Sequence, residues 1–104
     1  MDKNAAIDII RRYKKAIEAR NIRVDKIVLF GSYAFGNQRE GSDIDVAVIS
    51  DDFHGKGYWD RIDVLSDALC EVFEPIEAIA LTTEEWERGD KDIIEFARSG
   101  EVIE

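Results

Sequence analysis

The feature that most constrains this chain is a pair of apolar segments joined by a glycine-rich loop that ends in two aspartates. Residues 27–30 form a continuous apolar run, and Gly31 follows it at once. A second apolar run covers residues 46–49, and Asp43 and Asp45 come just before it. Short apolar runs bounded by glycine are typical of buried strands. The pattern therefore predicts two strands and a connecting loop that carries the polar chemistry.

We expect the first strand at residues 26–30 and the second at 43–49. The intervening loop, 31–42, holds three glycines and has room for only one helical turn, at 33–36. A parallel pair needs a longer crossover, usually a helix, so this short connection favours an antiparallel pair. Within a strand, side chains two positions apart share a face, which would place Asp43 and Asp45 together.

The rest of the chain predicts helices around these strands. Apolar residues recur at helical spacing over residues 3–20 and again over 58–73. The expected apolar face of the second helix consists of Tyr58, Ile62, Leu65, Leu69 and either Val72 or Phe73. Pro75 ends the second helix, and a third strand follows at 76–81. Two short helices and an edge strand at 102–103 complete the order α-β-loop-β-α-β-α-α. The fold class is therefore α/β (α+β), a small mixed sheet with helices packed on it.

Capping and helix-ending residues near the C-terminus support the two short helices. Thr82 and Glu85 have the spacing of a capping box, in which each side chain bonds the other residue's backbone N–H. Gly89 would stop that helix, Asp90 would cap the next, and Gly100 would close it.

Composition limits the function classes. A chain of 104 residues is expected to form one domain, 1–104, with a core of its own. Its net charge of −9 disfavours nonspecific binding to nucleic acid. No apolar run approaches the ~20 residues of a membrane span and no signal-peptide pattern is present, so we expect a cytoplasmic protein. The single cysteine, Cys70, is expected to be a partly buried, unreactive side chain.

Acidic side chains elsewhere have a simpler explanation than catalysis. Five of them recur every three or four residues along the second long helix, where they form its solvated face. These residues are Asp60, Asp63, Asp67, Glu71 and Glu74.

Asp43 and Asp45 have the chemistry of a divalent-metal site. Two residues of strand separate them by about 6.6 Å, so both carboxylates could reach one cation. Hard oxygen ligands without a nearby thiolate or imidazole select Mg²⁺ or Mn²⁺. A calcium EF-hand is excluded because Ala47 and Val48 occupy positions that this loop needs for a ligand and a glycine.

Gly31 and Ser32 would supply backbone N–H groups and a hydroxyl to a phosphate at the end of the first strand. The segment 55–57 reads Gly-Lys-Gly but lacks P-loop spacing, so we interpret it as a loop. Lys56 or Arg61 could extend to a triphosphate, and we assign His54 no role.

Residues 30–36, Phe-Gly-Ser-Tyr-Ala-Phe-Gly, and residues 41–46, Gly-Ser-Asp-Ile-Asp-Val, together resemble the signature of the minimal nucleotidyltransferases. These belong to the DNA polymerase beta-like superfamily, and the resemblance extends over nearly the whole chain. It implies a polymerase beta palm-like core and transfer of a nucleoside monophosphate, with AMP from ATP the expected case, to an acceptor hydroxyl. Pyrophosphate would leave.

The resemblance also implies roles for individual residues. Gly31, Ser32 and Ser42 would bind the nucleotide, and Asp43 and Asp45 would bind the metals. The family's third acid falls at Glu77, which would complete the catalytic and metal-binding set. The family usually has aspartate there, and many relatives have arginine where this chain has Phe35. Arg39 could replace that arginine only if the loop folded back.

Two functions remain open at this point. The first is an Mg²⁺- or Mn²⁺-dependent nucleotidyltransferase with a hydroxyl acceptor, for instance on a partner protein. The second is a non-catalytic nucleotide- or partner-binding subunit. The resemblance implies pairing with a HEPN-type helical protein, as in toxin–antitoxin systems. An exposed strand edge and the apolar C-terminal tail leave room for a homodimer. A nucleotide-sugar glycosyltransferase is excluded, because a chain this short cannot build the usual two-part cleft.

Overall fold

The computed structural model describes residues 1–89 and 91–104, so the expected cap at Asp90 lies outside the described residues. The sheet has four strands in the order β3-β2-β1-β4. β1 is antiparallel to β2 and β4, whereas β2 and β3 are parallel, so the predicted mixed sheet and the predicted antiparallel pair are both confirmed. The strands are β1 (Lys26–Phe30), β2 (Ile44–Ile49), β3 (Ile76–Leu81) and β4 (Glu101–Val102).

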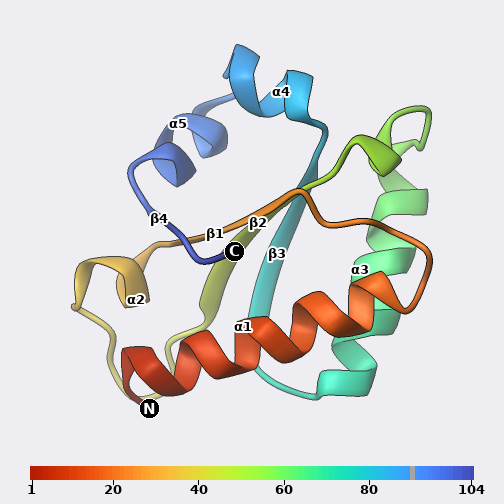
Figure 1. Cartoon of the computed structure of the whole chain (residues 1–104). Helices are drawn as coiled ribbons and strands as arrows, with labels where there is room; N and C mark the ends of the chain where they lie inside the picture. The colour runs from red at the N-terminus through yellow and green to blue at the C-terminus, as the bar shows by residue number, and fades with distance from the viewer. Residues whose placement is uncertain (90) are drawn as a thin grey trace.

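Helices cover both faces of this sheet (Figure 1). The long helices α1 and α3 pack on one face, where the larger core lies, and α4 and α5 lie against the other. No described helix is long and apolar enough to cross a membrane. The helical segments are α1 (Lys3–Glu18), α2 (Ser32–Phe35), the 3₁₀ turn η1 (Asp51–Phe53), α3 (Tyr58–Val72), α4 (Thr83–Arg88) and α5 (Asp92–Arg98).

Helix α1 forms as its pattern predicts. The Asp2 side chain caps it by accepting a hydrogen bond from Ala5 N–H at 2.8 Å, and its apolar stripe is buried against the sheet. The Tyr13 hydroxyl, at the centre of that stripe, donates to Leu65 O on α3 at 3.1 Å. Burial raises the pKa of Tyr13, so this hydroxyl stays protonated and keeps donating. The two long helices are thereby held side by side.

Helix α3 differs from the prediction in what it buries. Tyr58 is 67% exposed, Phe73 is 89% exposed, and Cys70 is exposed rather than partly buried. Phe73 follows the last helical residue in a left-handed conformation, φ 54°, which turns its side chain away from the apolar stripe. Leu65 and Ala68 are the residues of α3 that are fully buried.

The acidic face of α3 is a solvated face, as predicted. Its acids are exposed except Glu74, which is half-buried and pairs with Arg12 of α1 at 2.7 Å. The short helices also match. The capping box of Thr82 and Glu85 is present, and Gly89 ends α4 with φ 66°.

Candidate active site

Two acidic side chains lie next to each other on the face of the sheet that α4 and α5 share. Asp45 of β2 is directly opposite Glu77 of β3 in the parallel register. Residues opposite each other in neighbouring strands point to the same face, with their strands about 4.8 Å apart. Asp45 is half-buried and Glu77 is exposed on the last strand of the sheet. The fold therefore brings Glu77 to Asp45, as the proposed third-acid role requires.

Asp43 lies just before β2 rather than in it. Strand pairing begins at Ile44, whose N–H donates to Pro75 O at 2.8 Å, so the expected start at residue 43 was wrong by one position. The argument from strand alternation therefore does not place Asp43. Its side chain is exposed, and its charge still acts on Asp45.

The three carboxylates repel one another. Burial raises the pKa of Asp45, and the negative charges of Glu77 and then Asp43 raise it further. A cation placed among them would relieve both contributions, because it stabilises the ionised form of Asp45 and screens its neighbours.

The donor set fits a divalent cation that arrives together with phosphate. Within residues 1–89 and 91–104, no group of three or more His, Cys, Asp or Glu side chains is arranged to hold a metal ion. Mg²⁺ usually takes only one or two carboxylates and completes its octahedron with water and substrate phosphate oxygens. Asp45 with Asp43 or Glu77 could supply that number. The assignment of Asp43, Asp45 and Glu77 as metal ligands remains a prediction.

The glycine of the Gly-Ser pair touches the acid cluster. Gly31 precedes α2 with φ 73° and ψ −153°, a conformation that side chains disfavour. A Cβ atom at this position would overlap Asp45 Oδ2. Ser32 opens α2, and the first N–H groups of a helix have no partner within it. The residues predicted to bind phosphate and the residues predicted to bind metal are therefore adjacent.

Ser42 stabilises the turn before β2 through two hydrogen bonds with Arg39. Its hydroxyl accepts a hydrogen bond from Arg39 N–H at 2.8 Å, and its own N–H donates to Arg39 O at 2.9 Å. These bonds close the turn that leads into β2. A contact between Ser42 and a nucleotide remains a prediction. Arg39 is exposed in this turn.

An aromatic cluster borders the acid site. Phe30 is directly opposite Asp45 across β1 and β2. Phe96 of α5 packs edge-on against Phe30 with ring centroids 5.7 Å apart, and against Phe35 at 6.4 Å. Phe35 is 52% exposed and Phe96 is 49% exposed. Helical spacing assigns Phe96 to the apolar face of α5 but does not place it at the acid site, because only the tertiary fold brings α5 to the end of β1.

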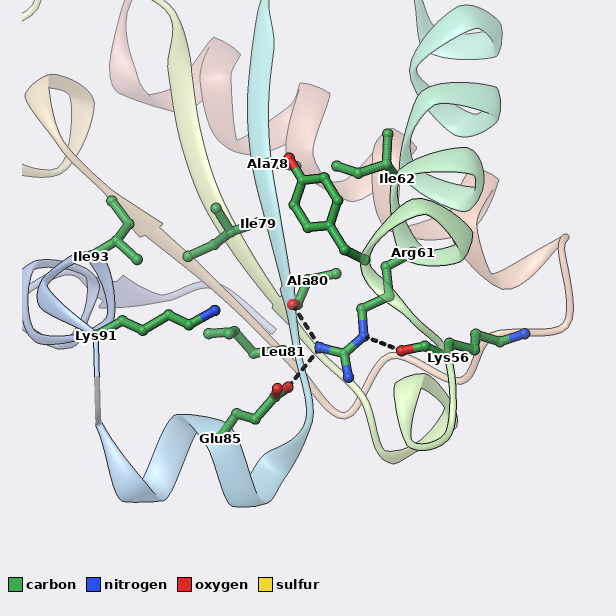
Figure 2. A pocket seen from close by; sticks show the side chains of 11 residues that line it. Lys56, Arg61, Ile62, Ala78, Ile79, Ala80, Leu81, Glu85, Lys91 and Ile93 are labelled. Carbon is green, nitrogen blue, oxygen red and sulfur yellow. Dashed lines mark hydrogen bonds and ion pairs between the residues drawn. The ribbon is translucent and has the colours of Figure 1, made fainter.

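A cavity of about 410 Å³ lies at the outer edge of β3 (Figure 2). Arg61 is fixed in it, since its Nη1 contacts Glu85 Oε1 at 2.6 Å and Ala80 O at 3.3 Å, and its Nε donates to Lys56 O at 3.0 Å. The guanidinium of Arg61 is therefore already engaged by these three partners, which argues against our expectation that Arg61 extends to a triphosphate. The lining residues are Lys56, Tyr58, Arg61, Ile62, Ala78, Ile79, Ala80, Leu81, Glu85, Lys91 and Ile93.

Glu85 is the counterpart of Arg61 in this cavity. Burial alone would raise the pKa of Glu85, but the hydrogen bonds from Thr82 and Arg61 and the charge of Arg61 outweigh it and lower the pKa. Glu85 also completes the capping box of α4. The side chain therefore joins α3, β3 and α4 in one network.

The site and the fold agree with what the chain is similar to. Residues 10–98 match the nucleotidyltransferase domain family, so the chain belongs to that family. In curated proteins of Methanocaldococcus jannaschii, it is 49% identical over 41 residues to "Putative protein adenylyltransferase MJ1215" and 47% identical over 45 residues to "Putative protein adenylyltransferase MJ1379". The first match covers 39% of this chain and 46% of the relative, and the second covers 43% and 44%. The chain thus spans less than half the length of the curated relatives it matches.

Solved structures share the fold. "Crystal structure of a putative nucleotidyltransferase from Sulfolobus solfataricus" superposes with a TM-score of 0.68 at 18% identity, over 83% of this chain and 75% of that one. A second structure, titled "Crystal structure of putative nucleotidyltransferase", has a TM-score of 0.57 and 28% identity over 93% of this chain and 95% of that one. The predicted family and fold class are confirmed.

Proposed function

We propose that this chain is a metal-dependent nucleotidyltransferase that transfers AMP from ATP to an acceptor hydroxyl on a protein. The observation that carries the proposal is the in-register pair of Asp45 and Glu77 beside the Gly31 turn. The names of the curated relatives support the choice of AMP and of a protein acceptor.

The chemistry is an in-line displacement at the α-phosphorus. The acceptor oxygen forms a bond to phosphorus, the bond to the bridging oxygen of the β-phosphate breaks, and pyrophosphate leaves with that electron pair. Gly31 and Ser32 present N–H groups toward the phosphates. Asp45 and Glu77 form the acidic face of the site, where a carboxylate takes the proton that the acceptor hydroxyl releases. When bound by Asp43, Asp45 and Glu77, Mg²⁺ or Mn²⁺ would neutralise the charge that develops on the transferring phosphate.

Titration calorimetry with ATP and Mg²⁺ tests the nucleotide site. We expect saturable binding that disappears when the metal is chelated and in the double variant Asp43→Asn/Asp45→Asn. A matched double variant, Asp63→Asn/Asp67→Asn, removes the same charge from the solvated face of α3 and should bind as the wild type does. Equal binding by both double variants would contradict the proposed site.

Transfer of AMP from ATP labelled at the α-phosphate tests the third acid. Glu77→Gln should reduce transfer strongly, because it keeps the size of the side chain and removes its charge. Glu77→Asp should maintain or raise transfer, since aspartate is the usual residue of the family. Unchanged transfer by Glu77→Gln would show that the third-acid assignment is wrong.

Two substitutions favour a second candidate, a non-catalytic binding subunit. Glu77 replaces the usual aspartate, and Phe35 stands where many relatives carry an arginine. Such a subunit would retain the fold, and the acid cluster would contribute nothing to partner binding. AMP transfer by the wild type and by Asp45→Asn distinguishes the two candidates. An enzyme transfers AMP as the wild type and loses this activity in Asp45→Asn, whereas a binding subunit transfers none and keeps the affinity of Asp45→Asn for a HEPN-type helical partner unchanged.

A further inference from the structure

β3 is the last strand on its side of the sheet, and it has an open outer edge. The carbonyl of Leu81 faces β2, where it accepts from Ser50 N–H at 2.9 Å. Backbone groups alternate in direction along a strand, so Ala78 and Ala80 turn theirs outward. Arg61 takes the Ala80 carbonyl at 3.3 Å. In the described part of the chain no strand pairs with Ala78 on this side.

The cavity of about 410 Å³ follows this edge. The first turns of α3, with Arg61 and Ile62, line one side, and Lys91 and Ile93 line the other (Figure 2). Ile79 also lines it, two residues beyond Glu77 on the same strand and on the same face. The cavity therefore runs along the edge toward the acid cluster.

The charge of the cavity is opposite to that of the whole protein. Arg61 is neutralised by Glu85 at 2.6 Å. Lys91 is exposed and forms no ion pair with any described residue, and Figure 2 shows its side chain reaching into the cavity. On a chain of net charge −9, a lysine between apolar walls with no ion-pair partner among the described residues is complementary to an acidic side chain.

We propose that the outer edge of β3 binds the acceptor as an extended polypeptide, which adds a strand beside β3 and places an acidic side chain against Lys91. This inference rests on the proposed function and names the class of its acceptor. Backbone hydrogen bonds to Ala78 and to Ala80 N–H would supply affinity, and alternate side chains would supply selectivity.

The geometry of an added strand puts the hydroxyl where the chemistry needs it. Neighbouring strands lie about 4.8 Å apart, and opposite residues share a face. An acceptor residue beside Glu77 would lie one strand from Glu77 and two from Asp45, on the same face as both. The next residue on that face, two positions along, would lie beside Ile79 and close to Lys91. We therefore expect an acid two or four residues from the acceptor hydroxyl.

Selection from a peptide library tests this without catalysis. The probe is a displayed library of short peptides with one central tyrosine, serine or threonine and random flanks, panned on the wild-type protein without nucleotide. We expect enrichment of Asp or Glu two or four positions from the hydroxyl residue. Ala78→Pro removes an outward N–H and blocks the edge, so it should weaken the selected peptides about tenfold.

A second variant keeps the test valid if Ala78→Pro does not fold. Lys91→Glu should weaken the acid-containing peptides about threefold to tenfold. Lys15→Glu, on the exposed face of α1, makes the same charge change away from the cavity. It should bind the acid-containing peptides as the wild type does. Fluorescence anisotropy of labelled peptides measures each affinity.

The inference is overturned if no peptide is recovered, if no acid is enriched, or if the selected peptides bind both lysine variants equally. It is also overturned if sedimentation shows a wild-type dimer that Ala78→Pro dissociates, because a second copy would then occupy the edge. Another result is that the peptides bind as expected to a protein that also binds ATP and Mg²⁺ and still never accept AMP. That result would support peptide binding at the edge of β3 and would contradict the proposed function instead.

Discussion

The two ends of β3 carry two charged clusters that are built in opposite ways. At its start, Glu77 lies opposite Asp45, and the pKa of Asp45 is raised by burial and by the negative charges of Glu77 and Asp43. Near its end, Glu85 contacts Arg61 at 2.6 Å and accepts from Thr82 N–H at 2.8 Å. Among the described residues, the cluster of Asp45 and Glu77 has no positive side chain to balance it, whereas Glu85 is balanced by Arg61.

The difference separates stability from function. The network of Arg61 and Glu85 joins α3, β3 and α4 and satisfies its own groups, so it stabilises the free protein. The cluster of Asp45 and Glu77 destabilises the free protein, because like charges are held together on a partly buried face. Clustered acids of this kind are common at functional sites, where a ligand supplies the missing charge.

Removing the charge of Asp45 should have the largest effect on function. Asp45→Asn keeps the shape of the side chain but removes the carboxylate that lies between Gly31 and Glu77. We expect transfer of labelled AMP to fall by roughly a thousandfold or more, because stabilisation of the developing phosphate charge is lost. The fold should remain, as circular dichroism would show. Retained transfer would contradict the role of the cluster.

Gly31→Ala should have the next largest effect, on both stability and binding. The added Cβ would overlap Asp45 Oδ2, and the residue would be held at φ 73°. We expect a loss of about 2–4 kcal/mol in the free energy of unfolding, measured with denaturant, together with weaker ATP binding.

Gly36→Ala is the matched control for this change. Gly36 has nearly the same φ, 74°, but its ψ of 17° places it in the left-handed region that side chains can adopt, and its Cβ would meet no atom within 4 Å. It should therefore lose only about 1 kcal/mol and keep its ATP affinity. Equal losses at the two glycines would contradict the additional cost that we assign to Gly31, which combines its backbone conformation with the contact to Asp45.

The smallest expected effect is at the other end of β3. Glu85→Gln should lower the free energy of unfolding by about 1 kcal/mol at neutral pH, since the charge facing Arg61 is lost while the cap remains. The folded-state pKa of Glu85 is lowered, so its contribution is present above the ordinary glutamate pKa and disappears as pH falls through the folded value. The two proteins should therefore converge in acid.

Glu84→Gln controls for this prediction. Glu84 pairs with Arg88 on the exposed face of α4 at 3.1 Å. An exposed pair of this kind contributes only about 0.3–0.5 kcal/mol. A pH-independent difference between wild type and Glu85→Gln would contradict the role of its charge.

Local patterns in the sequence predicted most of the fold. The bounds of β1 and β3 agree with the apolar runs, because Gly31 follows the first run and Thr82, the N-cap of α4, follows the second. The capping box of Thr82 and Glu85 needs only residues three positions apart, so it too could be found from sequence. Helical spacing left Val72 or Phe73 open as the last apolar position of α3. Val72 packs against the core, whereas Phe73 is exposed because the backbone turns left-handed at the end of α3.

The site was predictable only in part, because it depends on contacts between elements that are far apart in the sequence. The resemblance placed Glu77 as the third acid, and the parallel register of β2 and β3 now brings it to Asp45. The partners of Arg61 come from three separate elements, so no local spacing could reveal that its charge is already used. Lys91 escaped notice because nothing in its neighbourhood in the sequence shows that it lines the edge of β3.

The most direct test of this account is the thermal midpoint of wild type and Asp45→Asn, each with and without ATP and Mg²⁺. Without ligand, Asp45→Asn should unfold at the higher temperature, because the repulsion with Glu77 and Asp43 is relieved. With ligand, the order should reverse, since only the wild type binds and is stabilised by mass action. If Asp45→Asn unfolds lower in both conditions, or if ATP and Mg²⁺ raise both midpoints equally, the acid cluster is not a site that a metal-bound nucleotide completes.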